Sequence, residues 1–232
     1  MGVHEYVKYD FSLTFSMTIQ QLEQGLLFDS NMFVIIGSKS TALIDTGTGF
    51  ASDVTIKALT KVLNGRSLDI VILTHRHYDH VGGLGKIVEA FHPKVYAGKL
   101  DAVPIRDGDS DSTLGTKFGG HIEPTEVTDF NEGDEIDLGG HILTPYDSPG
   151  HTIGSIVVLD KVTRSLFSGD TFFVDGVGNY THPTGSGEML LQSLEKLEGL
   201  DFDALYPGHG PAVRSGGKQY IGKAITIMKG MR

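Results

Sequence analysis

The chain has 232 residues, of which 39% are hydrophobic, and it carries 19 basic against 29 acidic residues, a formal net charge of −10. This length and composition suit one globular α/β domain, which we predict over residues 1–232. The acidic balance disfavours non-specific nucleic-acid binding, which depends on basic side chains that neutralise phosphates. The sequence shows no membrane span of roughly 20 apolar residues and no signal-peptide core at its start, so we expect a cytoplasmic protein.

The first part of the chain shows short runs of alternating apolar and polar residues, which are typical of strands. These runs cover residues 7–15, 25–28, 32–36 and 41–45. Asp45 ends the last run, and we interpret it as a structural carboxylate that organises its own Thr-Gly-Thr-Gly turn. A metal ligand or a proton shuttle is the alternative role for this residue. A helix is expected over residues 54–63, with Ser52-Asp53 as its cap.

The stretch from Thr74 to Gly83 carries four candidate metal ligands within six residues, in the order H-x-H-x-D-H. An apolar run over residues 68–73 precedes it and predicts a buried strand, and a helical pattern over residues 84–90 follows it. The motif therefore lies on a strand-to-helix loop, where a rigid scaffold can direct several side chains to one point. A polar surface loop that happens to be rich in histidine is the alternative reading. The four candidates are His75, His77, Asp79 and His80.

The middle of the chain combines one short strand, at residues 94–97, with polar segments. Residues 104–120 are rich in Asp, Ser and Gly, which predicts a mobile loop or lid. Residues 131–134 form a hairpin-like turn signal. An alternating run over residues 141–146 then predicts another strand.

Three further candidate ligands each follow or precede an apolar run, on a loop that contains glycine. They are His151, Asp170 and His209. The aromatic and glycine-rich stretch at residues 170–184 directly follows one of them, so we expect it to wall the pocket. Tyr180 and His182 in this stretch are candidate hydrogen-bond donors to a substrate, with simple packing as the alternative. Helices are expected over residues 187–200 and 215–231.

Together, these seven side chains resemble the ligand set of the metallo-β-lactamase superfamily in spacing, order and local context. The segment Ala42–Gly47 is similar to the early strand and turn of that family, and the pattern is closest to the glyoxalase II-like branch. The resemblance implies an α/β fold, a four-layer αββα sandwich with its site at one edge of the paired sheets. True β-lactamases of this fold use a cysteine at a second-metal position, and this chain has no cysteine.

The resemblance also implies how the ligands are shared between two divalent ions. His75, His77 and His151 would hold one ion, Asp79, His80 and His209 would hold the second, and Asp170 would bridge them. Imidazoles and carboxylates without sulfur suit zinc, iron or manganese, and we expect zinc. Two such ions can bind a water molecule and lower its pKa to about 7, so that they hold it as hydroxide. Asp79 would act as a catalytic residue that helps to orient this nucleophile.

Three functions compete at this stage. The leading hypothesis is hydrolysis of a small ester-type substrate, a thioester or a lactone, by the dinuclear centre. The second is a mononuclear iron persulfide dioxygenase of the same superfamily, and the third is a nuclease or phosphodiesterase of the same fold. We expect a small-molecule substrate, with no nucleic-acid or membrane partner, and a homodimer is compatible with the frequency of twofold assemblies. Lys218, Lys223 and Lys229 match no glutathione-binding motif, so the acyl substrate is left generic.

Overall fold

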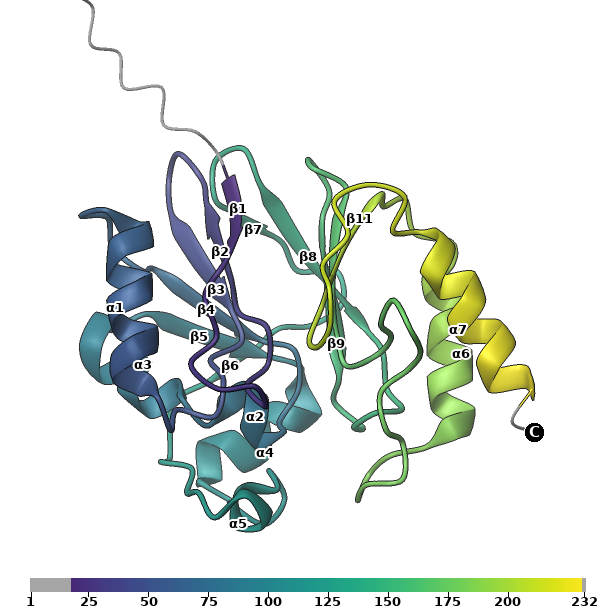
Figure 1. Ribbon diagram of the computed structural model, residues 1–232, viewed down its shortest axis with the longest axis horizontal. Coiled ribbons are helices and arrows are strands. Elements are labelled where there is room, and N and C mark those ends of the chain that lie inside the picture. Colours follow the sequence, from purple (N-terminus) through teal and green to yellow (C-terminus); the bar gives the residue numbers. More distant parts are fainter. Residues whose placement is uncertain (1–17, 231–232) are drawn as a thin grey trace, which may run out of the picture.

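Strands form two sheets in the computed structural model, which describes residues 18–230 (Figure 1). The first sheet has six strands in the order β1 (Thr18–Gln21), β2 (Phe33–Ile36), β3 (Thr41–Ile44), β4 (Ile70–Leu73), β5 (Lys94–Ala97) and β6 (Thr128–Asp129). The second has five, in the order β11 (Ala204–Pro207), β10 (Ser165–Gly169), β9 (Ile156–Asp160), β8 (Ile142–Asp147) and β7 (Ile136–Asp137). Neighbours from β3 to β6 are parallel, as are β10 and β11, and the other pairs are antiparallel.

The two sheets pack face to face because successive side chains of a strand point to opposite faces. On β2, Phe33 and Ile35 belong to the core between the sheets, whereas Val34 belongs to the core on the outer side of the first sheet. On β9, Ile156 lies between the sheets and Val157 lies on the outer side of the second sheet. Both sheets therefore bury both faces, which explains why their strands read as nearly continuous apolar runs.

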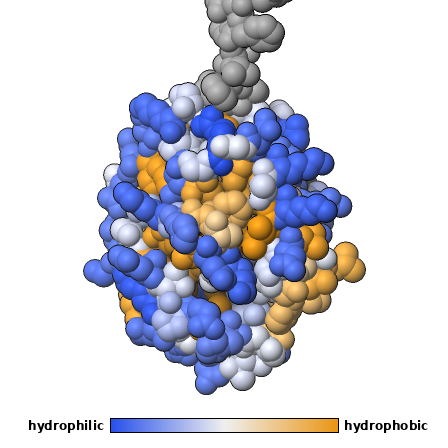
Figure 2. Space-filling view, turned by 90° about the vertical axis from the view of Figure 1, so that its left-hand side faces the viewer, coloured by the Kyte–Doolittle hydropathy of each residue, from blue (hydrophilic) through white to orange (hydrophobic). Residues whose placement is uncertain are grey.

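Helices cover the two outer faces. Helices α1 (Ser52–Leu63) and α3 (Leu84–Phe91) cover the first sheet, and α6 (Gly187–Leu197) and α7 (Gln219–Gly230) cover the second (Figure 1). The face on the side of α1 and α3 is largely hydrophilic, with hydrophobic residues exposed in patches (Figure 2). The layer order is helix, sheet, sheet, helix, and this confirms the predicted αββα sandwich.

Two strands of each sheet end at one edge of the sandwich, and hydrogen bonds join the sheets there. The backbone amide of Ile156, at the start of β9, donates to the carbonyl of Thr74, just after β4, over 2.9 Å. The backbone amide of Asn31 donates to the carbonyl of Gly208, just after β11, over 2.6 Å. Loops that follow β3, β4, β10 and β11 are thereby held close together, and they carry the candidate site.

The predicted strand at residues 25–28 is wrong. These residues form a turn, in which the amide of Asp29 donates to the carbonyl of Leu26 and the Asp29 carboxylate accepts the amide of Leu26. Leu27 is fully exposed, so this apolar run does not mark a buried strand. The strand predicted at residues 7–15 lies outside the described residues.

Three local predictions also change in the structure. Helix α4 (Lys99–Asp107) and the short helix α5 (Gly115–Phe118) occupy much of the predicted loop at residues 104–120. The turn at residues 131–134 exists, but it connects β6 of one sheet to β7 of the other instead of forming a hairpin. Helix α1 begins at Ser52 without a side-chain cap. None of the helices in the described part of the chain is long and apolar enough to cross a membrane.

Candidate metal centre

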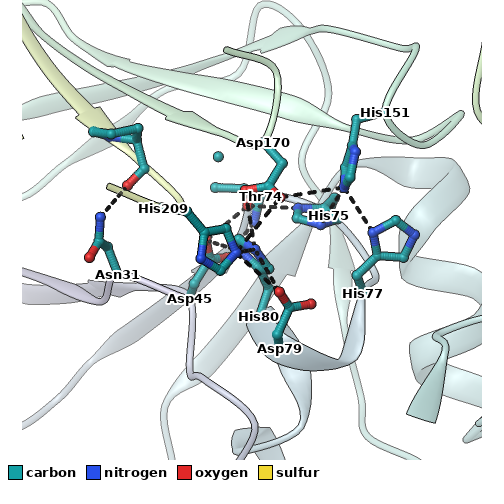
Figure 3. A network of polar contacts seen from close by, with 12 residues as sticks. Asn31, Asp45, Thr74, His75, His77, Asp79, His80, His151, Asp170 and His209 are labelled. Carbon is teal, nitrogen blue, oxygen red and sulfur yellow. Dashed lines mark hydrogen bonds and ion pairs between the residues drawn. The ribbon is translucent and has the colours of Figure 1, made fainter. Parts of the chain in front are cut away.

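The seven predicted ligands converge at this edge of the sandwich, although they come from four separate segments (Figure 3). His75 and His77 lie on the loop after β4, and the short helix α2 (Tyr78–Val81) carries Asp79 and His80. The other three follow later strands, since His151 lies between β8 and β9, Asp170 follows β10, and His209 follows β11. The structure brings together every ligand that the sequence predicted.

Three imidazoles form the first cluster. The Nε2 atom of His151 lies 3.1 Å from Nε2 of His75 and 2.8 Å from Nδ1 of His77. All three side chains are buried. Three nitrogens therefore face a common point.

The second cluster contains two imidazoles and a carboxylate. The Nε2 atom of His209 lies 3.0 Å from Oδ2 of Asp79 and 3.3 Å from Nε2 of His80. His80 is fully buried, whereas Asp79 and His209 are partly exposed. The second cluster is therefore more exposed to solvent than the first.

Asp170 lies between the two clusters. Its Oδ1 atom is 3.3 Å from Nε2 of His80, and its Oδ2 atom is 3.6 Å from Nε2 of His151 and 3.8 Å from Nε2 of His209. The Oδ1 atom is buried without a hydrogen-bond partner among the described residues. Position 208 must be glycine, because a Cβ there would lie 2.2 Å from this oxygen.

Outer hydrogen bonds set which imidazole nitrogen faces the centre of each cluster. His80 Nδ1 lies 2.9 Å from the Asp45 carboxylate, and His151 Nδ1 lies 2.7 Å from the carbonyl oxygen of Asn179. Both partners can only accept a hydrogen bond, so each Nδ1 carries the proton. In the neutral side chains, the lone pair of Nε2 then points into the cluster, as a metal ligand requires.

The clusters fit divalent metal ions. Nitrogens bound to one tetrahedral zinc ion lie roughly 3.3 Å apart, given bonds of about 2.0–2.1 Å, and the nitrogens within each cluster are 2.8 to 3.3 Å apart. Within the first cluster, and likewise within the second, the candidate ligand atoms lie within 4.8 Å of one another. A buried carboxylate oxygen without a partner and lone pairs that face one another are both satisfied by a cation between them.

In the metal-free protein, burial and mutual repulsion decide the charge of each group. Burial, followed by repulsion from the neighbouring imidazoles, lowers the pKa of His75 well below its ordinary value and that of His77 to about 2. Burial alone would lower the pKa of His80, but the carboxylates of Asp170, Asp45 and Asp79 raise it well above 6.5. Metal binding must therefore displace a proton from the second cluster.

These shifts predict a loss of stability in acid. His77 has a pKa of about 2 in the folded chain and an ordinary value of 6.5. Below pH 6.5, the unfolded chain therefore binds a proton that the folded chain excludes. We expect His77 to lower the free energy of unfolding of the metal-free protein by about 1.4 kcal/mol for each pH unit below 6.5.

Urea unfolding in the presence of a chelator, between about pH 7.5 and about pH 5, measures this slope. The matched variant is His77→Gln, because glutamine keeps a polar amide and does not titrate. Its slope is expected to be smaller than that of the native chain by the same amount. Equal slopes for the two proteins would contradict the prediction.

Asp45 differs from its predicted role. Its carboxylate accepts hydrogen bonds from the backbone amide and the hydroxyl of Thr74, each over 2.8 Å, and from Nδ1 of His80 over 2.9 Å. It does not organise its own turn, because Asp29 accepts the backbone amide and the hydroxyl of Thr48 there. Asp45 is instead a positioning residue for a candidate ligand, a role that the sequence interpretation missed.

A second buried carboxylate, Asp101, holds two ligand-bearing loops together. It accepts hydrogen bonds from the backbone amide of Arg76 over 2.9 Å and from the Arg76 guanidinium over 2.7 Å. It also accepts hydrogen bonds from the hydroxyl of Thr152 and the amide of Gly154, which follow His151 on the same loop. Asp101 is fully buried and Arg76 nearly so. This pair therefore fixes the first cluster, and no motif in the sequence marked it.

A cavity of about 290 Å³ opens over the two clusters. His182 lines it, with its ring centroid 5.4 Å from that of His77. Tyr180 is not among the lining residues, and its ring lies about 3 Å from where a Cβ on Gly187 would stand, at the start of α6. Of the two substrate-binding candidates, the structure therefore brings only His182 to the cavity.

The fold and the two candidate clusters are typical of a metal-dependent enzyme, and sequence comparison identifies the family. The model of the family described as the metallo-beta-lactamase superfamily matches residues 25–209. The chain belongs to this superfamily.

Several relatives are similar over most of the chain. A probable metallo-hydrolase of Methanocaldococcus jannaschii is 34% identical over 192 residues, which cover 80% of this chain and 90% of the relative. The crystal structure of TTHA1623 in a di-iron-bound form has 28% sequence identity and a TM-score of 0.72, and it covers 86% of this chain and 96% of that one.

Other relatives are similar over less of their own length or at lower identity. A hydroxyacylglutathione hydrolase of Vibrio parahaemolyticus is 33% identical over 137 residues, which cover 59% of this chain and 45% of the relative. The structure of ETHE1 from Myxococcus xanthus covers 93% of this chain and 92% of that one, with 23% identity and a TM-score of 0.66. That likeness concerns the fold alone.

Proposed function

We propose that this protein is a dinuclear metal-dependent hydrolase of a small ester-type substrate, a thioester or a lactone. The observation that carries the proposal is the position of Asp170, whose two carboxylate oxygens face ligand atoms of both clusters within 3.8 Å. A single-ion site needs no such shared carboxylate.

In this proposal, each cluster of side chains would bind one ion. His75, His77 and His151 would hold one ion, Asp79, His80 and His209 would hold the other, and Asp170 would contribute to both. Imidazole and carboxylate ligands suit zinc, which we propose as the native metal, and they also accept iron or manganese. The di-iron-bound relative supports two ions in this fold.

When bound, the ions supply a nucleophile from water at neutral pH and polarise the substrate carbonyl. The chain supplies a group that orients this water molecule. Burial alone would raise the pKa of Asp79, but His80 and His209 lower it below its ordinary value. Asp79 is therefore an ionised carboxylate on the wall of the cavity, placed to accept a hydrogen bond from a water molecule and orient it.

The alternatives predict different sites. A mononuclear iron persulfide dioxygenase needs one set of two histidines and one carboxylate, whereas here the second set is also assembled. A nuclease or phosphodiesterase needs basic side chains to hold phosphates, and the chain has a net charge of −10. Ester hydrolysis therefore accounts for the site better than either alternative.

Elemental analysis of protein purified without added metal, combined with a panel of thioesters and lactones, tests the proposal. We expect two equivalents of zinc, or of a zinc and iron mixture, together with turnover of at least one ester. Chelation is expected to remove activity, and addition of zinc to restore it. A single iron with oxygen consumption on a persulfide and no ester turnover would favour the dioxygenase. Failure to bind metal after loading would refute the proposed centre.

A further inference from the structure

One residue beside the metal clusters has a backbone conformation that its side chain disfavours. Leu114 has φ 64° and ψ 8°, in the left-handed region, where a leucine is a steric outlier. It is nonetheless buried, and it lines the cavity above the clusters. Strained residues persist where the surrounding structure holds them, and such residues gather at ligand sites.

The segment that carries Leu114, residues 109–120, is anchored at both ends. At its start, the backbone amide of Asp109 donates to the carbonyl of Pro104 on α4 over 2.9 Å. At its end, Gly120 packs so closely on Tyr78 that a Cβ would lie 2.1 Å from the tyrosine oxygen. Tyr78 lies between two candidate ligands in sequence, so this segment is fixed to the same loop that forms the metal clusters.

The segment contributes an apolar wall to the cavity. Phe118 lines it together with Leu114, and its ring packs against that of Tyr78 at a tilt of 33°, with 5.7 Å between the centroids. Phe173, on the segment that follows Asp170, is a third apolar lining residue. Phe118 remains 37% exposed, so part of its ring is open to solvent.

Cationic side chains are absent from this cavity. None of its described lining residues is lysine or arginine, and the nearby guanidinium of Arg76 is bound to Asp101. Apart from the ions of the proposed centre, a substrate that carries extra carboxylates would therefore find no cationic side chain of lysine or arginine on the described wall. The volume of about 290 Å³ is at the lower end of the range for ligand sites.

We infer that Leu114, Phe118 and Phe173 form an acyl subsite, and that the substrate carries a short, uncharged, apolar acyl group. This inference rests on the proposed ester hydrolysis and specifies its substrate class. Leu114 is then a specificity-determining residue, whose strained backbone directs its side chain over the metal clusters. An apolar pocket of this kind discriminates by the number of methylene groups that it buries.

Acetyl and hexanoyl thioesters of N-acetylcysteamine, which is uncharged, and a hydroxyacylglutathione thioester are the probes. For the zinc-loaded protein, we expect kcat/KM for the hexanoyl substrate to exceed that for the acetyl substrate by at least about tenfold. We expect the glutathione thioester to be the poorest of the three. A second measurement, independent of turnover, is calorimetric binding of hexanoate and acetate, with the same preference expected.

The variant Leu114→Gly removes a buried side chain, which costs stability, but it relieves the left-handed backbone and offsets part of that cost; urea unfolding checks that the variant is folded. We expect the hexanoyl preference to fall by about tenfold in kcat/KM and in binding. Phe118→Ala is expected to reduce the same ratio. The matched control is Arg164→Gly, which also replaces a residue at positive φ, 55°, but does not line the cavity. It is expected to leave the ratio unchanged.

The outcomes separate the two proposals. Ester turnover with a hexanoyl preference that neither Leu114→Gly nor Phe118→Ala changes would overturn the acyl subsite and leave the hydrolase intact. A preference for the glutathione thioester would do the same. Absence of turnover on every ester would refute the proposed function, and equal binding of hexanoate and acetate would then refute the subsite as well.

Discussion

Asp170→Asn is expected to lower kcat on the best ester substrate by at least about a hundredfold and to reduce the bound metal below two equivalents. The carboxylate is the shared group between the clusters, and its ionised form is strongly favoured. Burial alone would raise its pKa, but His80, His151 and His209 hold it well below the ordinary value. An amide has the same shape but no charge, and its nitrogen donates where a ligand must accept. A hundredfold loss of kcat corresponds to the loss of several kcal/mol of the transition-state stabilisation that the metal ions supply.

Elemental analysis and steady-state kinetics of the purified variant measure both effects. The matched control is Asp160→Asn. Asp160 is also a fully buried carboxylate, and it contacts a histidine, His141, over 2.6 Å, but it lies at the far end of β9. The control is expected to lose stability while it retains its metal and its kcat. An Asp170→Asn protein with two metal equivalents and more than about a tenth of the native kcat would contradict the bridging role.

Asp101→Asn is expected to lower the free energy of unfolding by about 3–5 kcal/mol, because it leaves the buried guanidinium of Arg76 without a charged partner. Arg76 and Asp101 have side chains that are 9% and 0% exposed, so water cannot replace the lost contact. The same carboxylate joins the loop of His75 and His77 to the loop of His151. We therefore also expect weaker metal binding by the first cluster.

Urea unfolding of the metal-free variant measures the first effect, and competition with a chelator measures the second. The control is Asp201→Asn, which removes the partner of Arg164 at the surface, where the two side chains are 79% and 52% exposed. An exposed pair of this kind contributes less than about 1 kcal/mol. If Asp101→Asn were no more destabilising than the control, the buried pair would have no positioning role.

The candidate ligands could be predicted because each one is marked locally. A ligand next to glycine, at the end of an apolar run, is visible in a few residues of sequence, as at His151 and His209. Short, mostly apolar runs also predicted most of the strands, since both faces of each sheet are covered. The false strand at residues 25–28 shows the limit of this reasoning, because a short apolar run can also be an exposed turn.

Contacts between distant segments could not be predicted in this way. Asp45 reaches a ligand 35 positions later, and Asp101 reaches Thr152 after 51 positions. A carboxylate at the end of a strand is a weak signal, since it can serve its own turn or a neighbouring strand equally well. The left-handed backbone of Leu114 has no sequence signal at all, because glycine or asparagine is the residue expected there.

By itself, the sequence identified the seven converging side chains, because ligand motifs are local properties of the chain, and the resemblance that these motifs carry implied the superfamily and its αββα class. Only the tertiary structure decided which oxygen of Asp170 faces which cluster, which buried carboxylates hold the ligand loops, and which wall of the cavity is apolar. These features depend on the packing of two sheets against each other, which places residues far apart in sequence within hydrogen-bonding distance.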